Sequence, residues 1–94
     1  MIIVAGRIEI APGRRDAFVL ASAEAVIAAR QAPGCHDFSV TPDSVDPNRV
    51  NVFERWGSAA ELEAFRGEGP GDDLSADIVG ADVSRYEISS TGPA

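Results

Sequence analysis

Two residues near the middle of this sequence, Glu54 and Trp56, combine a carboxylate with a large aromatic ring. Because they are two positions apart, a strand would place both side chains on one face, together with Val50 and Val52. In so apolar a neighbourhood, Glu54 is either a member of a buried ion pair or a general base. Trp56 is either a plain core residue or the wall of a cavity that stacks on an aromatic ligand.

His36 is the single histidine of the chain and the other candidate for proton transfer. Imidazole gains and loses its proton near neutral pH, so His36 is either a pocket base or a histidine satisfied in the core or at an interface. Its neighbour Cys35 points to the opposite face of a regular strand, away from the imidazole that could take its proton. We therefore do not expect Cys35 to be a nucleophile.

Metal and cofactor motifs are missing from the sequence. One cysteine and one histidine are too few for a Cys/His metal cluster. The glycine-rich stretch at residues 67–71 does not follow a strand in the GxGxxG form that binds dinucleotides. We therefore expect neither a metal nor a cofactor.

Arg85 and Tyr86 lie near the C-terminus and offer polar contacts to a substrate. Arg85 either binds a phenolate or carboxylate or is a surface or dimer-contact group. Tyr86 either donates a hydrogen bond to a substrate oxygen or, as we favour, fills the core with its ring. Phe38 and Phe65 are candidates for the apolar surface of the same pocket.

The composition limits both the architecture and the partners. The 94 residues, 45% of them hydrophobic, suffice for one domain, which we place at residues 1–94. Eight basic against fifteen acidic residues give a formal charge of -7, which disfavours nucleic acid and anionic membranes as partners. No basic leader precedes the first apolar residues, and no apolar run approaches the ~18 residues that span a bilayer. We therefore expect a soluble, cytoplasmic protein.

Glycine and proline divide the chain into segments. Residues 2–10 are rich in β-branched side chains and predict a strand, in which Gly6 marks either a bulge or a close backbone approach. Residues 14–31 contain no glycine or proline and are rich in alanine, which predicts a helix. The pair Pro33-Gly34 ends it.

The next two segments predict a hairpin. Residues 35–41 alternate between apolar and polar side chains, which predicts a strand with His36 and Phe38 on one face. Residues 42–48 form a loop, and residues 49–57 predict the partner strand.

Ser58 and Glu61 form a capping box, in which the Ser58 hydroxyl accepts from the Glu61 amide and the Glu61 side chain returns to the Ser58 amide. The box begins a helix that runs through Phe65 or Arg66. The remaining elements that we expect are a short helix over residues 72–79, a closing strand over residues 81–90 and a loose tail over residues 89–94.

The resulting order, β-α-β-β-α-β, is that of an α+β, ferredoxin-like fold with an antiparallel sheet. Three segments and the helix after Ser58 also resemble the antibiotic biosynthesis monooxygenase family of dimeric α+β barrels. The segments are Pro33-Gly34-Cys35, Asp46-Pro47-Asn48-Arg49 and Phe53-Glu54-Arg55-Trp56. The resemblance implies a homodimer that closes the uncovered sheet faces against each other. It also implies a cofactor-free oxygenase that oxidises a small aromatic or polyketide phenol or quinol with O2 to a quinone.

The match is partial at the residues that carry the chemistry. The strand Asn of polyketide-tailoring members falls at Val52, their helix Tyr falls at Leu62, and the helix His of other relatives falls at Phe65 or Arg66. Without a helix imidazole to ligate iron, a haem oxygenase is not expected. The alternatives are a ligand-binding or structural dimer without turnover, and an isomerase or lyase on the same scaffold.

Overall fold

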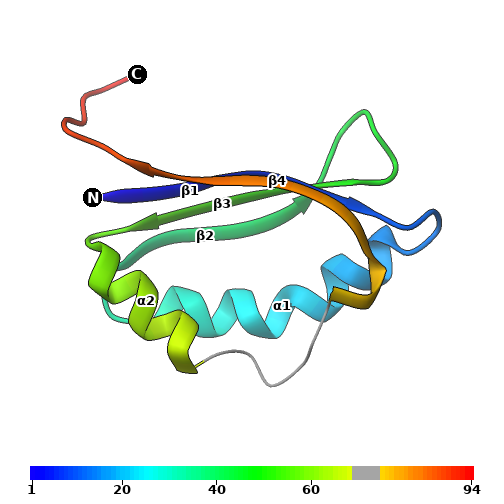
Figure 1. The fold of residues 1–94 in the computed structure, drawn as a ribbon, viewed down its shortest axis with the longest axis horizontal. Coiled ribbons are helices and arrows are strands. Elements are labelled where there is room, and N and C mark those ends of the chain that lie inside the picture. The colour runs from blue at the N-terminus through cyan, green and yellow to red at the C-terminus, as the bar shows by residue number, and fades with distance from the viewer. Residues whose placement is uncertain (69–74) are drawn as a thin grey trace.

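Four strands and two helices follow one another in the order β1, α1, β2, β3, α2, β4 (Figure 1). The computed structural model describes residues 1–68 and 75–94. The elements are β1 (Ile2–Ile10), α1 (Arg15–Gln31), β2 (Cys35–Pro42), β3 (Arg49–Trp56), α2 (Ala59–Glu68), a short 3-10 turn η1 (Ser75–Asp77) and β4 (Ile78–Glu87). The strands pair antiparallel in the order β2-β3-β1-β4. The predicted α+β, ferredoxin-like fold class is therefore confirmed.

Helix α1 lies between two turns that glycine makes possible. Gly13 and Gly34 have φ angles of 79° and 82°, in the left-handed region that side chains disfavour. The helix ends at Gln31, because Ala32 is already extended and Pro33 has no amide hydrogen to continue the ladder. No helix in the described part of the chain is long and apolar enough to cross a membrane.

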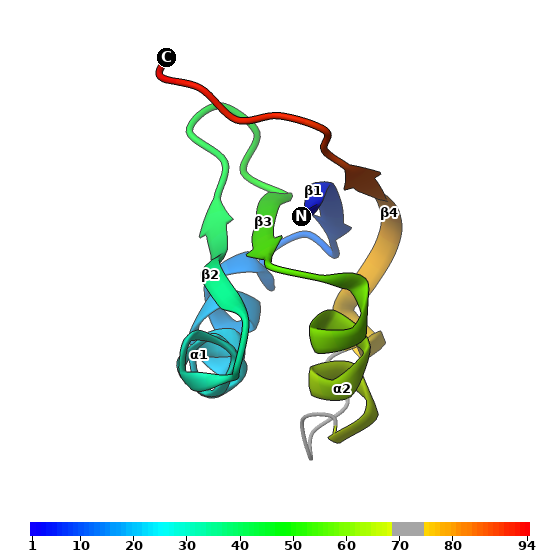
Figure 2. The ribbon, with the colours of Figure 1, turned by 90° about the vertical axis from the view of Figure 1, so that its left-hand side faces the viewer.

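Both helices lie on the same side of the sheet (Figure 2). We call the covered side the helix face and the other side the open face. On the helix face, Ile2, Val4 and Ile10 of β1 are buried, as are Val50 and Trp56 of β3. The alternate positions form the open face: Ile3, Ala5, Arg7 and Glu9 of β1, Asp37, Ser39 and Thr41 of β2, Arg49, Asn51, Phe53 and Arg55 of β3, and Asp82, Ser84 and Tyr86 of β4.

The core consists of two clusters on the helix face. One contains Ile2, Val4, Ala29, Phe38, Trp56 and Leu62, and the other contains Ile10, Phe18 and Val50. Helix α1 contributes to both clusters, through Ala29 and Phe18, whereas α2 contributes Leu62 to the first. Each fully buried large apolar side chain stabilises the fold by about 1.5–3 kcal/mol.

Most predicted boundaries agree with the structure. β1 has the predicted ends, and α1, β2 and β3 each differ from the prediction by one residue at one end. α2 continues to Glu68, past the end expected at Phe65 or Arg66.

Two expectations about the C-terminal part are wrong. Residues 75–79 contain only a three-residue 3-10 turn and the start of β4, not the end of a helix; residues 72–74 lie outside the described part. Tyr86 does not fill the core, because it pairs with Ile3 on the open face and is 52% exposed. Because β4 pairs with β1, it begins three residues before its predicted start. The same pairing fixes which of its side chains face the helices.

The backbones of β1 and β4 approach each other closely at Gly6. This confirms one of the two predictions for that residue. A Cβ atom at this position would meet the carbonyl oxygen of Asp82 and lie 2.6 Å from the Cα of Val83. The bulge between β1 and β4 falls elsewhere, between Glu9 and Ile10. The missing side chain at Gly6 therefore lets β1 and β4 pair without a local displacement.

Replacing Gly6 with alanine should lower the free energy of unfolding by about 1–3 kcal/mol, because the added methyl group forces β4 away from β1. Urea denaturation measures the change. Gly67→Ala is the matched control: nothing lies within 4 Å of the added methyl group, and alanine favours a helix, so its stability should be unchanged or higher. Equal stability of Gly6→Ala and the wild type would contradict the close approach.

Asp43 organises the loop between β2 and β3. Its Oδ2 accepts hydrogen bonds from the amides of Asp46, at 2.9 Å, and Val45, at 3.1 Å, and its Oδ1 accepts from Asn51 Nδ2 at 2.9 Å. The Asp46 amide first, then Asn51 and Val45, lower the pKa of this carboxyl to about 2 from its ordinary 3.8. The ionised form of Asp43 therefore stabilises the loop.

Because the pKa of Asp43 is lower in the folded chain, its stabilising effect is present above about pH 4 and is lost as the pH falls toward 2. Asp43→Asn removes the titration and retains a side-chain acceptor. The wild type should be more stable than Asp43→Asn at pH 6, and the difference should shrink at pH 2, as measured by urea midpoints. A difference that stays constant between these pH values would show that Asp43 titrates normally.

Candidate functional site

Three aromatic side chains meet on the helix face. The Trp56 ring lies 5.4 Å from the Phe65 ring at a tilt of 33°, and Phe65 meets Phe38 edge-on at 6.0 Å, all between ring centroids. β3, α2 and β2 thus each supply one ring. Such pairs add about 0.5–1.5 kcal/mol beyond the burial of their area. We call these three rings the aromatic cluster.

The aromatic cluster depends on how α2 begins and how β2 is held. Ser58 Oγ accepts the Glu61 amide at 3.2 Å, which confirms that half of the predicted capping box. The Glu61 carboxylate in turn accepts from the Ser58 hydroxyl at 3.0 Å. On β2, the carbonyl of Phe38 accepts a hydrogen bond from Arg30 Nε of α1 at 2.8 Å. These contacts fix the two elements that carry Phe65 and Phe38.

Glu54 lies within the same face and is 7% exposed. Its Oε1 accepts a hydrogen bond from the indole Nε1 of Trp56 at 3.0 Å. In the sheet it stands between Phe38 of β2 and Val4 of β1. No arginine among residues 1–68 and 75–94 forms an ion pair with it. The ion-pair interpretation of Glu54 therefore finds no partner in the described chain, and a neutral donor holds the carboxylate.

The regular alternation that predicted the face of His36 does not hold at this position. The pairing with β3 shifts by one residue between Cys35 and Asp37, which makes His36 the extra residue of a β-bulge and leaves it exposed. A bulge interrupts the two-residue alternation from which its face was inferred. The imidazole Nε2 lies near Gly57, 3.5 Å from where a Cβ would stand.

Cys35 packs against the buried cluster instead. Burial raises the pKa of its thiol, and a backbone hydrogen bond at Asp37 offsets only part of that rise. A thiol with a raised pKa is mostly protonated near neutral pH, which disfavours it as a nucleophile.

Arg85 and Tyr86 are separated by the sheet. Arg85 is on the side of the helices, where its Nη1 lies 3.3 Å from Glu63 Oε1 of α2 in an exposed ion pair. Val4 stands between Arg85 and Glu54 in the sheet. Tyr86 is on the open face. The structure therefore brings Trp56, Glu54, Phe38 and Phe65 together, places Arg85 at the edge of the same face, and places His36 and Tyr86 elsewhere.

The hydrogen bond between Trp56 and Glu54 is not among the contacts predicted from the sequence. The signal that could have indicated it was their spacing of two in a strand, which was used only to place both on one face. Within the described residues, no group of three or more His, Cys, Asp or Glu side chains is arranged to hold a metal ion.

Comparisons with known proteins agree with this fold. A family model described as antibiotic biosynthesis monooxygenase matches residues 1–70. The uncharacterized protein sll1783 of Synechocystis is 32% identical over 62 residues, which cover 66% of this chain and 42% of that protein. The chain thus spans less than half of that relative.

Two solved structures extend the likeness over nearly the whole chain. A Deinococcus radiodurans protein, proposed in its description to be an antibiotic biosynthesis monooxygenase, superposes with a TM-score of 0.85 at 19% identity and covers 100% of this chain and 98% of its own. A Nitrosomonas europaea protein with the same proposed activity has a TM-score of 0.82 at 16% identity and covers 94% and 98%. At these identities, the likeness supports the fold.

The bond between Trp56 and Glu54 can be measured by a double-mutant cycle. Trp56→Phe should cost about 2–4 kcal/mol of unfolding free energy, because it removes volume and leaves a buried carboxylate without its donor. Glu54→Gln keeps an acceptor without the charge and should cost less than about 1 kcal/mol. The double variant should lose less unfolding free energy than the sum of the two single losses, by about 1–2 kcal/mol in urea denaturation. Additive effects would mean that the Trp56 indole binds the Glu54 carboxylate no more strongly than it binds a carboxamide at that position.

Proposed function

Because the chain belongs to the antibiotic biosynthesis monooxygenase family, we propose that it is a cofactor-independent monooxygenase that oxidises an aromatic phenol or quinol with O2 to a quinone. The observation that carries the proposal is the buried carboxylate of Glu54 beside the aromatic cluster. A carboxylate in an apolar site costs free energy that packing alone does not recover. A role in the reaction accounts for its presence there.

Glu54 acts as the general base. The indole of Trp56 occupies Oε1 and orients the carboxylate, while Oε2 takes the proton of the substrate hydroxyl. The electron-rich anion then transfers electrons to O2, and a carbon–oxygen bond forms at the ring. For a phenol, one oxygen atom stays on the ring as the new carbonyl and the other leaves as water with the two displaced hydrogens. The phenol supplies all four electrons, whereas a quinol supplies two electrons and two hydrogens and O2 leaves as H2O2, so neither substrate needs another reductant.

The aromatic cluster accounts for the class of substrate. Trp56 and Phe38 are buried against Phe65, which is half-buried, so a flat aromatic substrate enters the cluster beside Phe65 and stacks there. A site lined by such groups excludes water, which strengthens the electrostatic contacts to a phenolate. Arg85, at the edge of the same face, contacts a second oxygen of the substrate. His36 and Tyr86 take no part in this scheme, because His36 is exposed at the β-bulge and Tyr86 lies on the open face.

The active protein in this proposal is a homodimer. The open face carries Ile3 of β1, Phe53 of β3 and Tyr86 of β4, and neither α1 nor α2 covers it (Figure 2). A sheet with one uncovered face and apolar groups on it gains stability when a second layer packs there. A second subunit supplies that layer.

A ligand-binding dimer without turnover is the second candidate. The observation in its favour is that Leu62, fully buried, and Val52 stand where the resemblance places the polar side chains of catalytic relatives. A binder would raise its melting temperature with flat phenols but consume no oxygen.

Oxygen uptake with a panel of anthrols, naphthols and quinols tests the reaction. The wild type should consume O2 faster than the substrates autoxidise, and Glu54→Gln should lower kcat by about 10²–10⁴-fold because the base is lost. His36→Ala is the matched control, since its imidazole is exposed at the bulge, and it should retain full activity.

Activity that survives Glu54→Gln but is lost in His36→Ala would overturn the assignment of the base. A melting temperature that rises with the phenols while no variant consumes oxygen would favour the binding dimer. Product that forms without oxygen uptake would indicate an isomerase or lyase.

A further inference from the structure

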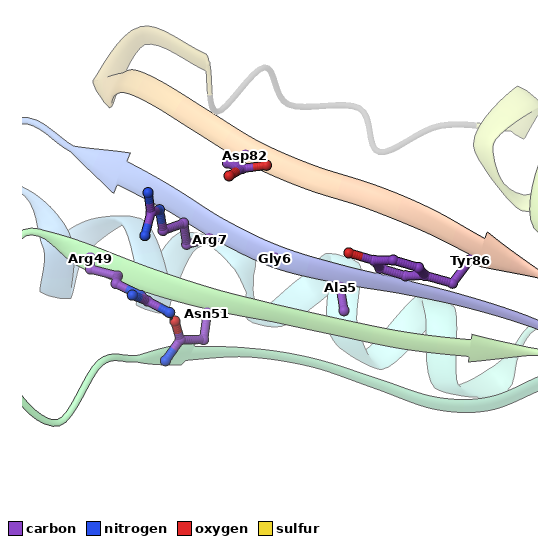
Figure 3. A pocket seen from close by; sticks show the side chains of 7 residues that line it. All are labelled: Ala5, Gly6, Arg7, Arg49, Asn51, Asp82 and Tyr86. Atoms are coloured by element: carbon purple, nitrogen blue, oxygen red, sulfur yellow. The ribbon is translucent and has the colours of Figure 1, made fainter.

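The open face has an apolar half and a polar half. Near the start of β1 it carries the apolar side chains Ile3, Phe53 and Tyr86, on which the proposed second subunit packs. Toward the end of β1 the face is polar, and it contains a hollow of about 370 Å³ (Figure 3). The Tyr86 ring covers the end of this hollow over Ala5, so its open volume lies at the other end. The polar side chains that line it are Arg7, Arg49, Asn51, Asp82 and Tyr86.

The two arginines of the hollow lack the carboxylate partners that the sheet places opposite them. Glu9 pairs with Arg49 in the register, but its Oε2 lies 3.4 Å from where a Cβ atom of Gly80 would stand, so its carboxylate is turned toward β4. Asp82 pairs with Arg7 in the register, yet Arg7 forms no ion pair in the part of the chain that the structure describes. Both guanidinium groups therefore keep donors for a ligand.

Hydrogen bonds at the base of the loop between β2 and β3 fix one of these guanidinium groups. Arg49 Nε donates to Asn51 Oδ1 at 2.7 Å and lies 3.6 Å from Asp43 Oδ1. Asn51 Nδ2 in turn donates to the same Asp43 oxygen at 2.9 Å. These contacts occupy only the Nε of Arg49 and leave its two Nη atoms for a ligand. Because the side chain is already held in place, less conformational entropy is lost when a ligand binds.

The two guanidinium groups are close enough to share one anion. Arg7 and Arg49 are diagonal neighbours on β1 and β3, and such pairs have Cα atoms about 7–8 Å apart. Like charges at this spacing repel each other, and an anion between them removes the repulsion. A phosphate group suits the position because its oxygens accept bidentate hydrogen bonds from arginine. The formal charge of -7 repels anions from most of the surface, so this pair of arginines gives the attraction its location.

Asp82 and Tyr86 restrict the ligand further. The Tyr86 hydroxyl points along β1 toward Gly6 and offers one more donor to the anion (Figure 3). The Asp82 carboxylate repels an isolated anion, but it accepts a hydrogen bond from a hydroxyl group. The lining therefore favours a phosphate ester that carries a hydroxyl group over inorganic phosphate.

We propose that the hollow binds a small phosphate monoester with a free hydroxyl group. Its phosphate lies between Arg7 and Arg49, and its hydroxyl donates to Asp82. The site is on the opposite side of the sheet from Glu54, so this inference goes beyond the proposed monooxygenase reaction and does not depend on it.

Isothermal titration calorimetry of the full chain at low ionic strength tests the site, with glycerol phosphate and inorganic phosphate as the two probes. The wild type should bind glycerol phosphate more tightly than inorganic phosphate. Asp82→Asn should reduce that preference, because the loss of a negative charge helps inorganic phosphate most.

Arg7→Gln should weaken the binding of glycerol phosphate at least about tenfold, because it removes a charge-assisted contact. Arg7 forms no ion pair in the described chain, so its replacement should leave the fold intact. Arg49→Gln should weaken the binding to a similar extent. Arg66→Gln is the matched control: it removes the same charge from an exposed position of α2, on the helix face, and should leave the affinity unchanged.

Equal weakening by Arg66→Gln and Arg7→Gln would show that the phosphate responds only to the net charge, and would overturn the site. A wild type that binds neither probe would overturn it as well. Inorganic phosphate that binds as tightly as glycerol phosphate would refute the role of Asp82. Oxygen uptake judges the reaction at Glu54 separately from all of these outcomes.

Discussion

Two helices can cover only one face of a four-stranded sheet, and α1 and α2, the α-helices among residues 1–68 and 75–94, pack on the same face. This constraint divides the molecule chemically. The covered face gathers the apolar core and, within it, one carboxylate; the uncovered face carries a balanced set of charges with a few apolar side chains. The antiparallel register ties the two faces together, because each strand contributes alternate residues to both.

The covered face has an unusual feature in Glu54. Its carboxylate is desolvated, and the hydrogen bond from Trp56 compensates only part of that cost, since the indole is a neutral donor. A sequence selected for stability alone would place an apolar side chain there, as Val50 and Val52 are placed on the same strand face. A buried carboxyl group that is kept at a cost in stability is typical of a site that performs chemistry.

Local sequence signals were sufficient for the first three strands and α1, because alanine content, β-branched runs and the Pro33-Gly34 break act over short distances. They were insufficient where the structure depends on pairing between segments that are distant in the sequence. The bulge at His36 arises in the register between β2 and β3, and the early start of β4 arises from its pairing with β1. The same pairing turned Tyr86 outward. Within the candidate site, spacing placed Glu54 and Trp56 on one face, but the contact between them required the rotamers of both side chains.

The central claim is that an aromatic ligand binds against Trp56 on the covered face. Trp56 is the chain's single tryptophan, so its fluorescence reports this site alone. We would titrate the protein with a flat quinone in the absence of O2, with N-acetyltryptophanamide as the control for collisional quenching. The account predicts saturable quenching of Trp56 at quinone concentrations that leave the control emission unchanged. Quenching that rises linearly and equally in both would show that no ligand reaches Trp56, and would contradict the account.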